Sequence, residues 1–244
     1  MRPRANKLFT LVCVPHAGGG ASSFHPWQRH LPARVELRVV QLPGREERWR
    51  EPLVRRLEPA CDALAHAIEA EIDGPYAIFG HSMGALVAYE LVRTLRRRAQ
   101  PLPMRLFVSA RAAPHAPIVT RAHTLPDDEL RATIVHHGGT AHAILEDDAF
   151  GAALLRVIRA DFELSETYAH APEAPLDIPL SVYGATLDRL VPPGRLDGWR
   201  QHARDFSLRI FEGDHFYVRT QGTSVVHSIL QELAADSRAA ARSA

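Results

Sequence analysis

The strongest chemical signal in the sequence is a serine flanked by two glycines. Residues 80–84 read Gly-His-Ser-Met-Gly, with Ser82 at the centre, and fit the G-x-S-x-G pattern of a nucleophile elbow. In such a turn the serine takes a strained backbone conformation, and the positions two residues before and after it have no room for a side chain. The pattern therefore predicts that the hydroxyl of Ser82 is a nucleophile at the positive end of a helix.

A serine hydroxyl needs a base, and the base needs an acid that orients it. In hydrolases with this elbow the acid and then the histidine follow the serine along the chain. Asp188 and His215 each lie in a loop directly after an apolar, strand-like segment. Because the carboxyl ends of parallel strands meet at one edge of a sheet, these loops are expected to converge on Ser82. The sequence therefore predicts a catalytic triad of Ser82, His215 and Asp188.

Four other side chains are weaker candidates for the base or the acid. His202 and His227 lie in helical patterns, which favours structural or surface positions. Asp177 precedes its strand and would lie at the opposite edge of the sheet. Asp214 is the direct neighbour of His215, and neighbours in sequence rarely point at one another. The predicted triad is therefore unchanged.

Acyl transfer also needs two backbone N–H donors that stabilise the negative oxygen of the tetrahedral intermediate. Met83, the residue after the nucleophile, supplies one of them. A glycine-rich loop after an early strand usually supplies the other, and residues 16–20 read His-Ala-Gly-Gly-Gly. A phosphate-binding loop would need G-x-G-x-x-G, or a lysine and a hydroxyl residue after the glycines, and neither is present. The N–H groups of Ala17 and Met83 are therefore the predicted oxyanion hole.

Short apolar runs alternate with segments of helical periodicity along the chain. This alternation indicates crossover connections, and so an α/β fold with a mostly parallel sheet and helices on both faces. Ser82 then lies at the turn from the third strand into a helix. The tail at 234–244 is small and polar and is expected to fray. The predicted strands are 8–14, 36–41, 76–79, 105–109, 179–183 and 207–211, and the predicted helices are 57–72, 83–97, 127–136, 147–168 and 224–235.

One segment interrupts this rhythm. Residues 110–178 separate two predicted strands, far more than a usual crossover needs, and contain helical patterns but no convincing strand. Insertions after the carboxyl end of a strand overhang the ligand crevice. We therefore expect a single domain over 1–244 with a helical lid at about 112–176, the alternative being ordinary extra helices on the sheet edge.

Composition excludes several classes of function. The chain has 244 residues, 46% of them hydrophobic and 23% charged, which is typical of globular proteins. Its net charge is +1, so no strong field favours nucleic acid or an anionic membrane. Cys13 and Cys61 are too few for a disulfide framework and are expected to be buried thiols. No signal peptide or membrane span is apparent, which favours a cytoplasmic protein, and a monomer is expected.

Histidine is abundant, with 14 residues, so a metal site needs consideration. The densest group is His136, His137 and His142. It lacks the i, i+4 spacing around a glutamate that zinc enzymes use, and no cysteine lies nearby. We therefore expect a solvated cluster and no metal.

Four motifs carry a family resemblance. They read Pro-His-Ala-Gly-Gly at 15–19, Leu-Pro-Gly-Arg-Glu at 42–46, Gly-His-Ser-Met-Gly-Ala at 80–85 and Gly-Asp-His-Phe at 213–216. Together they resemble type II thioesterases, the stand-alone editing enzymes of nonribosomal peptide and polyketide synthesis, which have the α/β-hydrolase fold. The elbow is shared with lipases and esterases, whereas the two early motifs are more particular. The resemblance extends from about residue 9 to 233, and departs from the family at Gly20, Glu212 and Asp214.

The resemblance implies hydrolysis of acyl groups from the phosphopantetheine arm of acyl or peptidyl carrier proteins, with small acyl groups as substrates and a mobile helical lid. Phosphopantetheine belongs to the substrate, so no separate cofactor is implied. Two alternatives remain: a fatty-acyl chain-releasing thioesterase or small-ester hydrolase, and a non-catalytic carrier-binding protein that keeps the fold. The residues that fall on the family's triad and oxyanion hole are Ser82, Asp188 and His215, and Ala17 and Met83.

Overall fold

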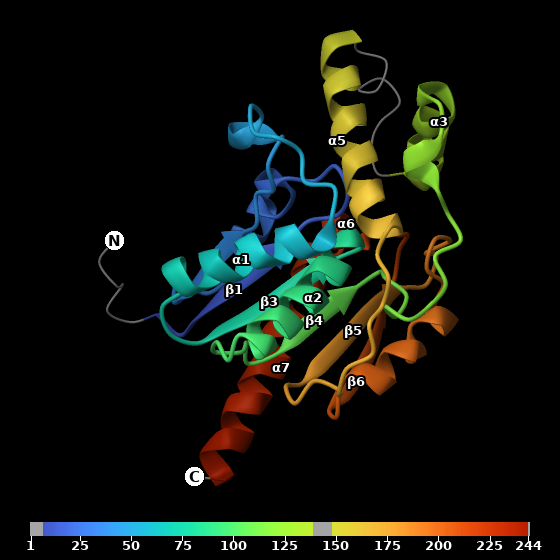
Figure 1. Ribbon diagram of the computed structural model, residues 1–244. Coiled ribbons are helices and arrows are strands. Elements are labelled where there is room, and N and C mark those ends of the chain that lie inside the picture. Colours follow the sequence, from blue (N-terminus) through green and yellow to red (C-terminus); the bar gives the residue numbers. More distant parts are fainter. Residues whose placement is uncertain (1–6, 139–147, 244) are drawn as a thin grey trace.

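A computed structural model describes residues 7–138 and 148–243 of the chain. At its centre lies a six-stranded sheet in the order β2-β1-β3-β4-β5-β6, in which all neighbouring strands run parallel (Figure 1). This confirms the α/β class and the parallel sheet that the alternating pattern predicted. The strands are β1 (Phe9–Val14), β2 (Val35–Val39), β3 (Tyr76–His81), β4 (Leu106–Ser109), β5 (Leu180–Ala185) and β6 (Phe206–Phe211).

Helices cover both faces of this sheet. α1 (Leu57–Glu71) and α2 (Met83–Arg97) pack on one face, and α7 (Gly222–Ser243) packs on the other, preceded by the short α6 (Tyr217–Thr220) (Figure 1). In the described residues, 3₁₀ helices lie in the connections: η1 (Ala21–Ser23), η2 (His25–His30), η3 (Glu46–Arg48), η4 (Ala122–Thr124), η5 (Pro193–Arg195) and η6 (Asp197–His202).

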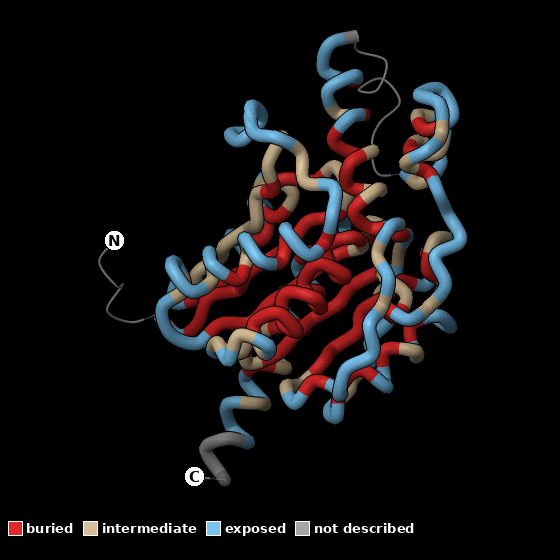
Figure 2. The backbone as a smooth tube through the Cα atoms, viewed as in Figure 1, coloured by how far each residue is buried: buried red, intermediate tan, exposed pale blue. Residues whose placement is uncertain are grey.

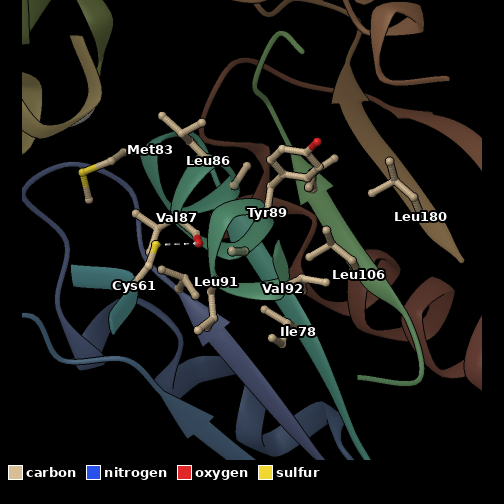
Figure 3. Close-up of a cluster of buried hydrophobic side chains, with 14 of the residues drawn as sticks. Cys61, Ile78, Met83, Leu86, Val87, Tyr89, Leu91, Val92, Leu106 and Leu180 are labelled. Atoms are coloured by element: carbon tan, nitrogen blue, oxygen red, sulfur yellow. Dashed lines mark hydrogen bonds between the residues drawn. The ribbon is translucent and has the colours of Figure 1, made fainter. Parts of the chain in front are cut away.

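The strands are buried on both sides because two hydrophobic clusters sandwich the sheet. In β1, Val12 and Val14 face the α1/α2 cluster, whereas Leu11 and Cys13 face the α7 cluster. Figure 2 shows the resulting band of buried backbone through the central strands and α2. Figure 3 shows side chains of α2 packed against residues of the strands. On the α1 side, the Sγ of Cys61 lies 3.7 Å from the carbonyl oxygen of Val87. Both cysteines are buried free thiols, as expected.

The C-terminal helix is longer than the sequence suggested. α7 continues to Ser243, so the expectation of a frayed tail from residue 234 is wrong. Alanine-rich turns favour helix on their own. In addition, Arg105, directly before β4, donates two hydrogen bonds, of 2.8 and 2.7 Å, to the carboxylate of Asp236. This pair ties the later turns of α7 to the sheet.

Between β4 and β5 the chain forms η4, α3 (Asp127–His137) and α5 (Asp148–Glu166). α3 and α5 stand above the sheet in Figure 1. They share a small hydrophobic cluster of their own, separate from the two clusters that enclose the sheet, and its buried members are Ala122, Leu130, Ile134, Leu155 and Ile158. None of the helices in the described parts of the chain is long and apolar enough to span a membrane.

Candidate active site

The turn between β3 and α2 holds Ser82 in a conformation that few side chains adopt. Its backbone angles are φ 57° and ψ −117°, and its N–H donates to the carbonyl oxygen of Ser109 on β4 at 2.8 Å. A β-carbon on Gly80 would lie 2.1 Å from the carbonyl oxygen of Gly84, and one on Gly84 would lie 2.1 Å from that of Val14. Both glycines are therefore required by close backbone approach, and the turn presents the serine at the first turn of α2.

The three residues predicted to form the triad meet at this point. The Nε2 of His215 lies 3.0 Å from the Oγ of Ser82, and its Nδ1 lies 2.9 Å from the Oδ2 of Asp188. The Asp188 and His215 side chains are buried. The other oxygen of Asp188 accepts hydrogen bonds from the N–H groups of Leu190 and Val191, each at 2.9 Å. These donors fix the carboxylate so that it faces the imidazole.

The loops that carry the acid and the base are joined to each other. The N–H of Leu187 donates to the carbonyl oxygen of Gly213 at 2.8 Å, which ties the loop after β5 to the loop after β6. The Asp214 carboxylate bonds within its own loop. Its Oδ1 accepts the N–H of Phe216 at 2.8 Å and closes the turn around His215. The order of the two parallel strands thus brings Asp188 and His215 together.

The weaker candidates lie elsewhere. His202 contacts the hydroxyl of Tyr89 at 3.0 Å and the ring of His115 at 2.8 Å. Two further candidates are exposed: Asp177 pairs with Arg204, and the imidazole of His227 contacts Gln231 on α7. No hydrogen bond links any of them to the Ser82 hydroxyl within the described residues.

Ser82 and His215 open into a cavity of about 280 Å³. Ala17 and Met83, the predicted oxyanion donors, line the same cavity. Met83 is the first residue of α2, so its N–H has no acceptor within the helix. In the described part of the chain no protein acceptor takes the N–H of Ala17, whereas the next two N–H groups of its loop are engaged. Both donors are therefore available beside the nucleophile.

A buried ion pair braces the loop that carries Ala17. Arg45 donates two hydrogen bonds, of 2.7 and 2.8 Å, to Asp161 on α5, and a third, of 3.1 Å, to the carbonyl oxygen of Gly19. Asp161 also accepts the N–H of Gly18 at 2.7 Å. Its side chain is fully buried. Sequence reasoning missed Asp161, although an acidic residue on the apolar face of a helix, between Ile158 and Leu164, signals a buried partner.

Substitution of Asp161 by asparagine is expected to destabilise the protein strongly. It leaves the guanidinium of Arg45 buried without its counter-charge, and breaking a buried pair lowers the free energy of unfolding by about 3–5 kcal/mol. The matched control is Glu163→Gln on the same helix, which loses only a solvent-exposed pair with Arg55 and should cost at most about 1 kcal/mol. Urea unfolding of the two variants measures the difference, and equal small losses would refute a bracing role.

Two further histidines, His81 and His16, lie close to His215. The ring of His81 lies 5.4 Å from that of His215 and 6.0 Å from that of His16, measured between centroids. Burial, assisted by Arg219, His215 and Arg45, lowers the pKa of His16 to about 3, and burial lowers the pKa of His81 well below its usual value. Both rings are therefore neutral at physiological pH and add no positive charge next to His215. The sequence motifs contain both residues, but their packing was not predicted.

Of the histidine group considered for a metal, His136 and His137 end α3, and His137 lines the cavity. His142 lies outside the described residues. Across 7–138 and 148–243, no three His, Cys, Asp or Glu side chains are grouped so that they could hold a metal ion.

Comparison with known proteins identifies the family of the chain. A family model described as a thioesterase domain matches residues 9–233. The chain is 35% identical over 225 residues to the gramicidin S biosynthesis protein GrsT of Aneurinibacillus migulanus, covering 91% of this chain and 88% of that protein.

Solved structures show the same relationship. RedJ, a thioesterase from the prodiginine pathway of Streptomyces coelicolor, superposes with a TM-score of 0.81 at 41% identity, covering 88% of this chain and 81% of that one. YbtT, a type II thioesterase from the yersiniabactin nonribosomal peptide and polyketide pathway, superposes with a TM-score of 0.87 at 29% identity, covering 97% of each chain. The chain therefore belongs to the thioesterase family of α/β-hydrolase fold, among the type II thioesterases of nonribosomal peptide and polyketide pathways.

Proposed function

We propose that this chain hydrolyses acyl thioesters on the phosphopantetheine arm of carrier proteins and so removes aberrant or stalled acyl groups. The observation that carries the proposal is the continuous contact from Ser82 through His215 to Asp188, at 3.0 and 2.9 Å, beside a cavity. A neutral imidazole that accepts from a hydroxyl and donates to a buried carboxylate is the arrangement that activates serine.

In the first half-reaction, the Oγ of Ser82 attacks the thioester carbonyl carbon as its proton passes to the Nε2 of His215. Asp188 holds the Nδ1–H of the ring and stabilises the imidazolium that forms. The carbonyl oxygen becomes an oxyanion and accepts hydrogen bonds from the N–H groups of Ala17 and Met83. When the C–S bond breaks, the pantetheine sulfur leaves as a thiol with the proton from His215, and the acyl group remains on Ser82.

The second half-reaction releases the acid. His215 takes a proton from water, and the resulting hydroxide attacks the acyl ester on Ser82. The same two N–H groups stabilise the second oxyanion. The C–O bond then breaks, and the Oγ of Ser82 recovers its proton from His215. The cycle consumes one water for each thioester and needs no group beyond the substrate's own arm.

The volume of the cavity favours small acyl groups. Its volume of about 280 Å³ is at the lower limit of small-molecule sites. Residues of α5, such as Phe162 and Ser165, line it together with residues that follow β4. We infer that the helices between β4 and β5 act as the lid of this chamber. Because the triad and the cavity both lie within one chain, we expect the enzyme to act as a monomer on acyl or peptidyl carrier domains.

The test compares one acyl group on three carriers. Propionyl groups are presented on a holo carrier protein, on coenzyme A and as an ethyl oxygen ester, and kcat/KM is measured for each. We expect the carrier-bound thioester to be hydrolysed fastest, because it alone offers a protein surface in addition to the arm.

The other outcomes identify the alternatives. A preference for the ethyl ester would make the protein a small-ester hydrolase. Faster turnover of palmitoyl-carrier than of propionyl-carrier would make it a chain-releasing thioesterase. Binding of the carrier without any hydrolysis would make it a non-catalytic carrier-binding protein, and each of these results would overturn the proposal.

A further inference from the structure

Three buried polar side chains join the nucleophile turn to the segment that carries the base. The Nδ1 of His81, the residue before Ser82, lies 2.8 Å from the Oγ of Ser109 at the end of β4. The same Oγ lies 2.7 Å from the hydroxyl of Tyr217, which begins α6 two residues after His215. All three side chains are fully buried. This buried polar chain therefore runs from β3 through β4 to α6.

Ser109 contacts both the nucleophile turn and the segment of the base. Its backbone carbonyl oxygen accepts the N–H of Ser82 at 2.8 Å, which helps to hold the strained turn. Its hydroxyl contacts Tyr217, so a single residue relates the position of the loop at 212–216 to that of the turn. The contact between the Nε2 of His215 and the Oγ of Ser82, at 3.0 Å, is thus supplemented by a second, buried link.

Aromatic packing fixes the orientation of the rings in this link. Phe211 precedes the loop of the base and Tyr217 follows it, and their rings stack with centroids 5.4 Å apart and an interplanar angle of 18°. The stack therefore closes the loop where it leaves β6. The ring of His81 lies 5.4 Å from that of His215, so the chain also packs directly against the base.

The members of the buried polar chain are neutral at physiological pH. Burial lowers the pKa of His81 well below its usual value, and burial raises the pKa of the Tyr217 hydroxyl above its usual range. The chain therefore places no charge beside the imidazolium that forms during catalysis, and no step of the mechanism passes a proton through it. Its contribution to the reaction is orientation.

We propose that the buried chain of His81, Ser109 and Tyr217 is a positioning device for the triad. It holds the imidazole of His215 in line with the Oγ of Ser82. The inference rests on the proposed catalytic roles of these two residues and adds the groups that orient them. Proton transfer and attack require close alignment of the reacting atoms, and a misplacement of about 1 Å can lower the rate about 100-fold.

The first test removes one hydroxyl at a time. Tyr217→Phe keeps the ring and loses the contact with Ser109. With propionyl-carrier as substrate, we expect kcat to fall about 10- to 100-fold, while KM changes less than about threefold because both half-reactions use His215.

Tyr89→Phe is the matched control, since it also loses a buried hydroxyl beside a neutral partner, 3.0 Å from the Nδ1 of His202 and away from the triad. It should lower the melting temperature about as much as Tyr217→Phe but keep kcat within about threefold of wild type. An unchanged kcat in Tyr217→Phe, or equal losses of kcat in the two variants, would overturn the positioning role.

The second test asks whether the residues act as one unit. Ser109→Ala removes the central hydroxyl and keeps the backbone carbonyl that accepts the N–H of Ser82. Members of one hydrogen-bonded chain have non-additive effects. The double variant Ser109→Ala/Tyr217→Phe should therefore lower kcat no more than about threefold beyond the larger single effect. Losses that multiply would mean that the two residues act separately, which contradicts the chain.

Fluorophosphonate labelling separates this inference from the proposed function, because the labelling rate reports activation of Ser82 by His215 without any thioester. Slower labelling of Tyr217→Phe, with wild-type labelling of Tyr89→Phe, supports the positioning role. If wild type hydrolysed no thioester and still gave this labelling pattern, the proposed function alone would fail. Equal labelling of wild type and Tyr217→Phe would refute positioning, while hydrolysis of propionyl-carrier by wild type would leave the proposed function intact.

Discussion

Substitution of Ser82 by alanine is expected to lower kcat for acyl-carrier hydrolysis about 10⁵- to 10⁶-fold, the size of effect that removal of a serine nucleophile produces elsewhere. The cause is the loss of the acyl-enzyme, since no other hydroxyl contacts the Nε2 of His215 in the described residues. The oxyanion donors and the cavity remain, so a small residual rate from bound water is expected. Single-turnover assays with radiolabelled acyl-carrier measure both rates.

The control for this prediction is Ser224→Ala, an exposed serine at the start of α7. The Ser224→Ala variant should keep wild-type turnover. A fluorophosphonate probe should label the Ser224→Ala variant but fail to label the Ser82→Ala variant. Labelling of the Ser82→Ala variant, or turnover within tenfold of wild type, would show that the nucleophile is a different residue.

Asp188→Asn is expected to lower kcat about 10³- to 10⁴-fold with little change in stability. The asparagine keeps the shape of the side chain and can still accept from the N–H groups of Leu190 and Val191. Its amide, however, can donate to the Nδ1 of His215. The single ring proton then lies on Nε2, so this nitrogen can no longer accept the proton of Ser82. The imidazolium also loses its counter-charge.

The adjacent Asp214→Asn provides a matched control, because the Asp214 carboxylate closes its own turn through the N–H of Phe216. It should change kcat less than about threefold, as expected for a group outside the proton path. Steady-state kinetics of the two variants, with the melting temperature as a check on folding, separates the roles. Equal losses in both would mean that the acid of the triad was assigned wrongly.

Local signals explain why much of the site could be predicted. Ser82 is marked by two glycines whose absent β-carbons relieve contacts within the turn and with β1. Asp188 and His215 are marked by their position after apolar runs, because parallel strands end at a common edge. The structure brings these three side chains together, while their catalytic roles stay predictions that the substitutions above test.

What could not be predicted depends on contacts between distant parts of the chain. Asp161 and Arg45 are 116 positions apart, and no local pattern in either segment indicates the other residue as its partner. Tyr217 directly follows a recognisable motif, but its contact with Ser109 depends on how α6 packs against the end of β4. The length of α7 was underestimated for the same reason, since Arg105, which pairs with Asp236, directly precedes β4.

The position of Asp161 constrains how the chamber can open. Helix α5 forms part of the wall of the cavity, and the same helix supplies the carboxylate that holds Gly18 beside Ala17, the predicted oxyanion donor. If α5 swung outward as a rigid body, it would pull this anchor from the loop and leave Arg45 uncompensated. We therefore expect the arm to enter by displacement of α3, whose exposed ion pair from Asp127 to Arg159 of α5 does not involve the loop that carries Ala17. On this view we expect substrate admission and the order of the loop that carries Ala17 to depend on the same helix.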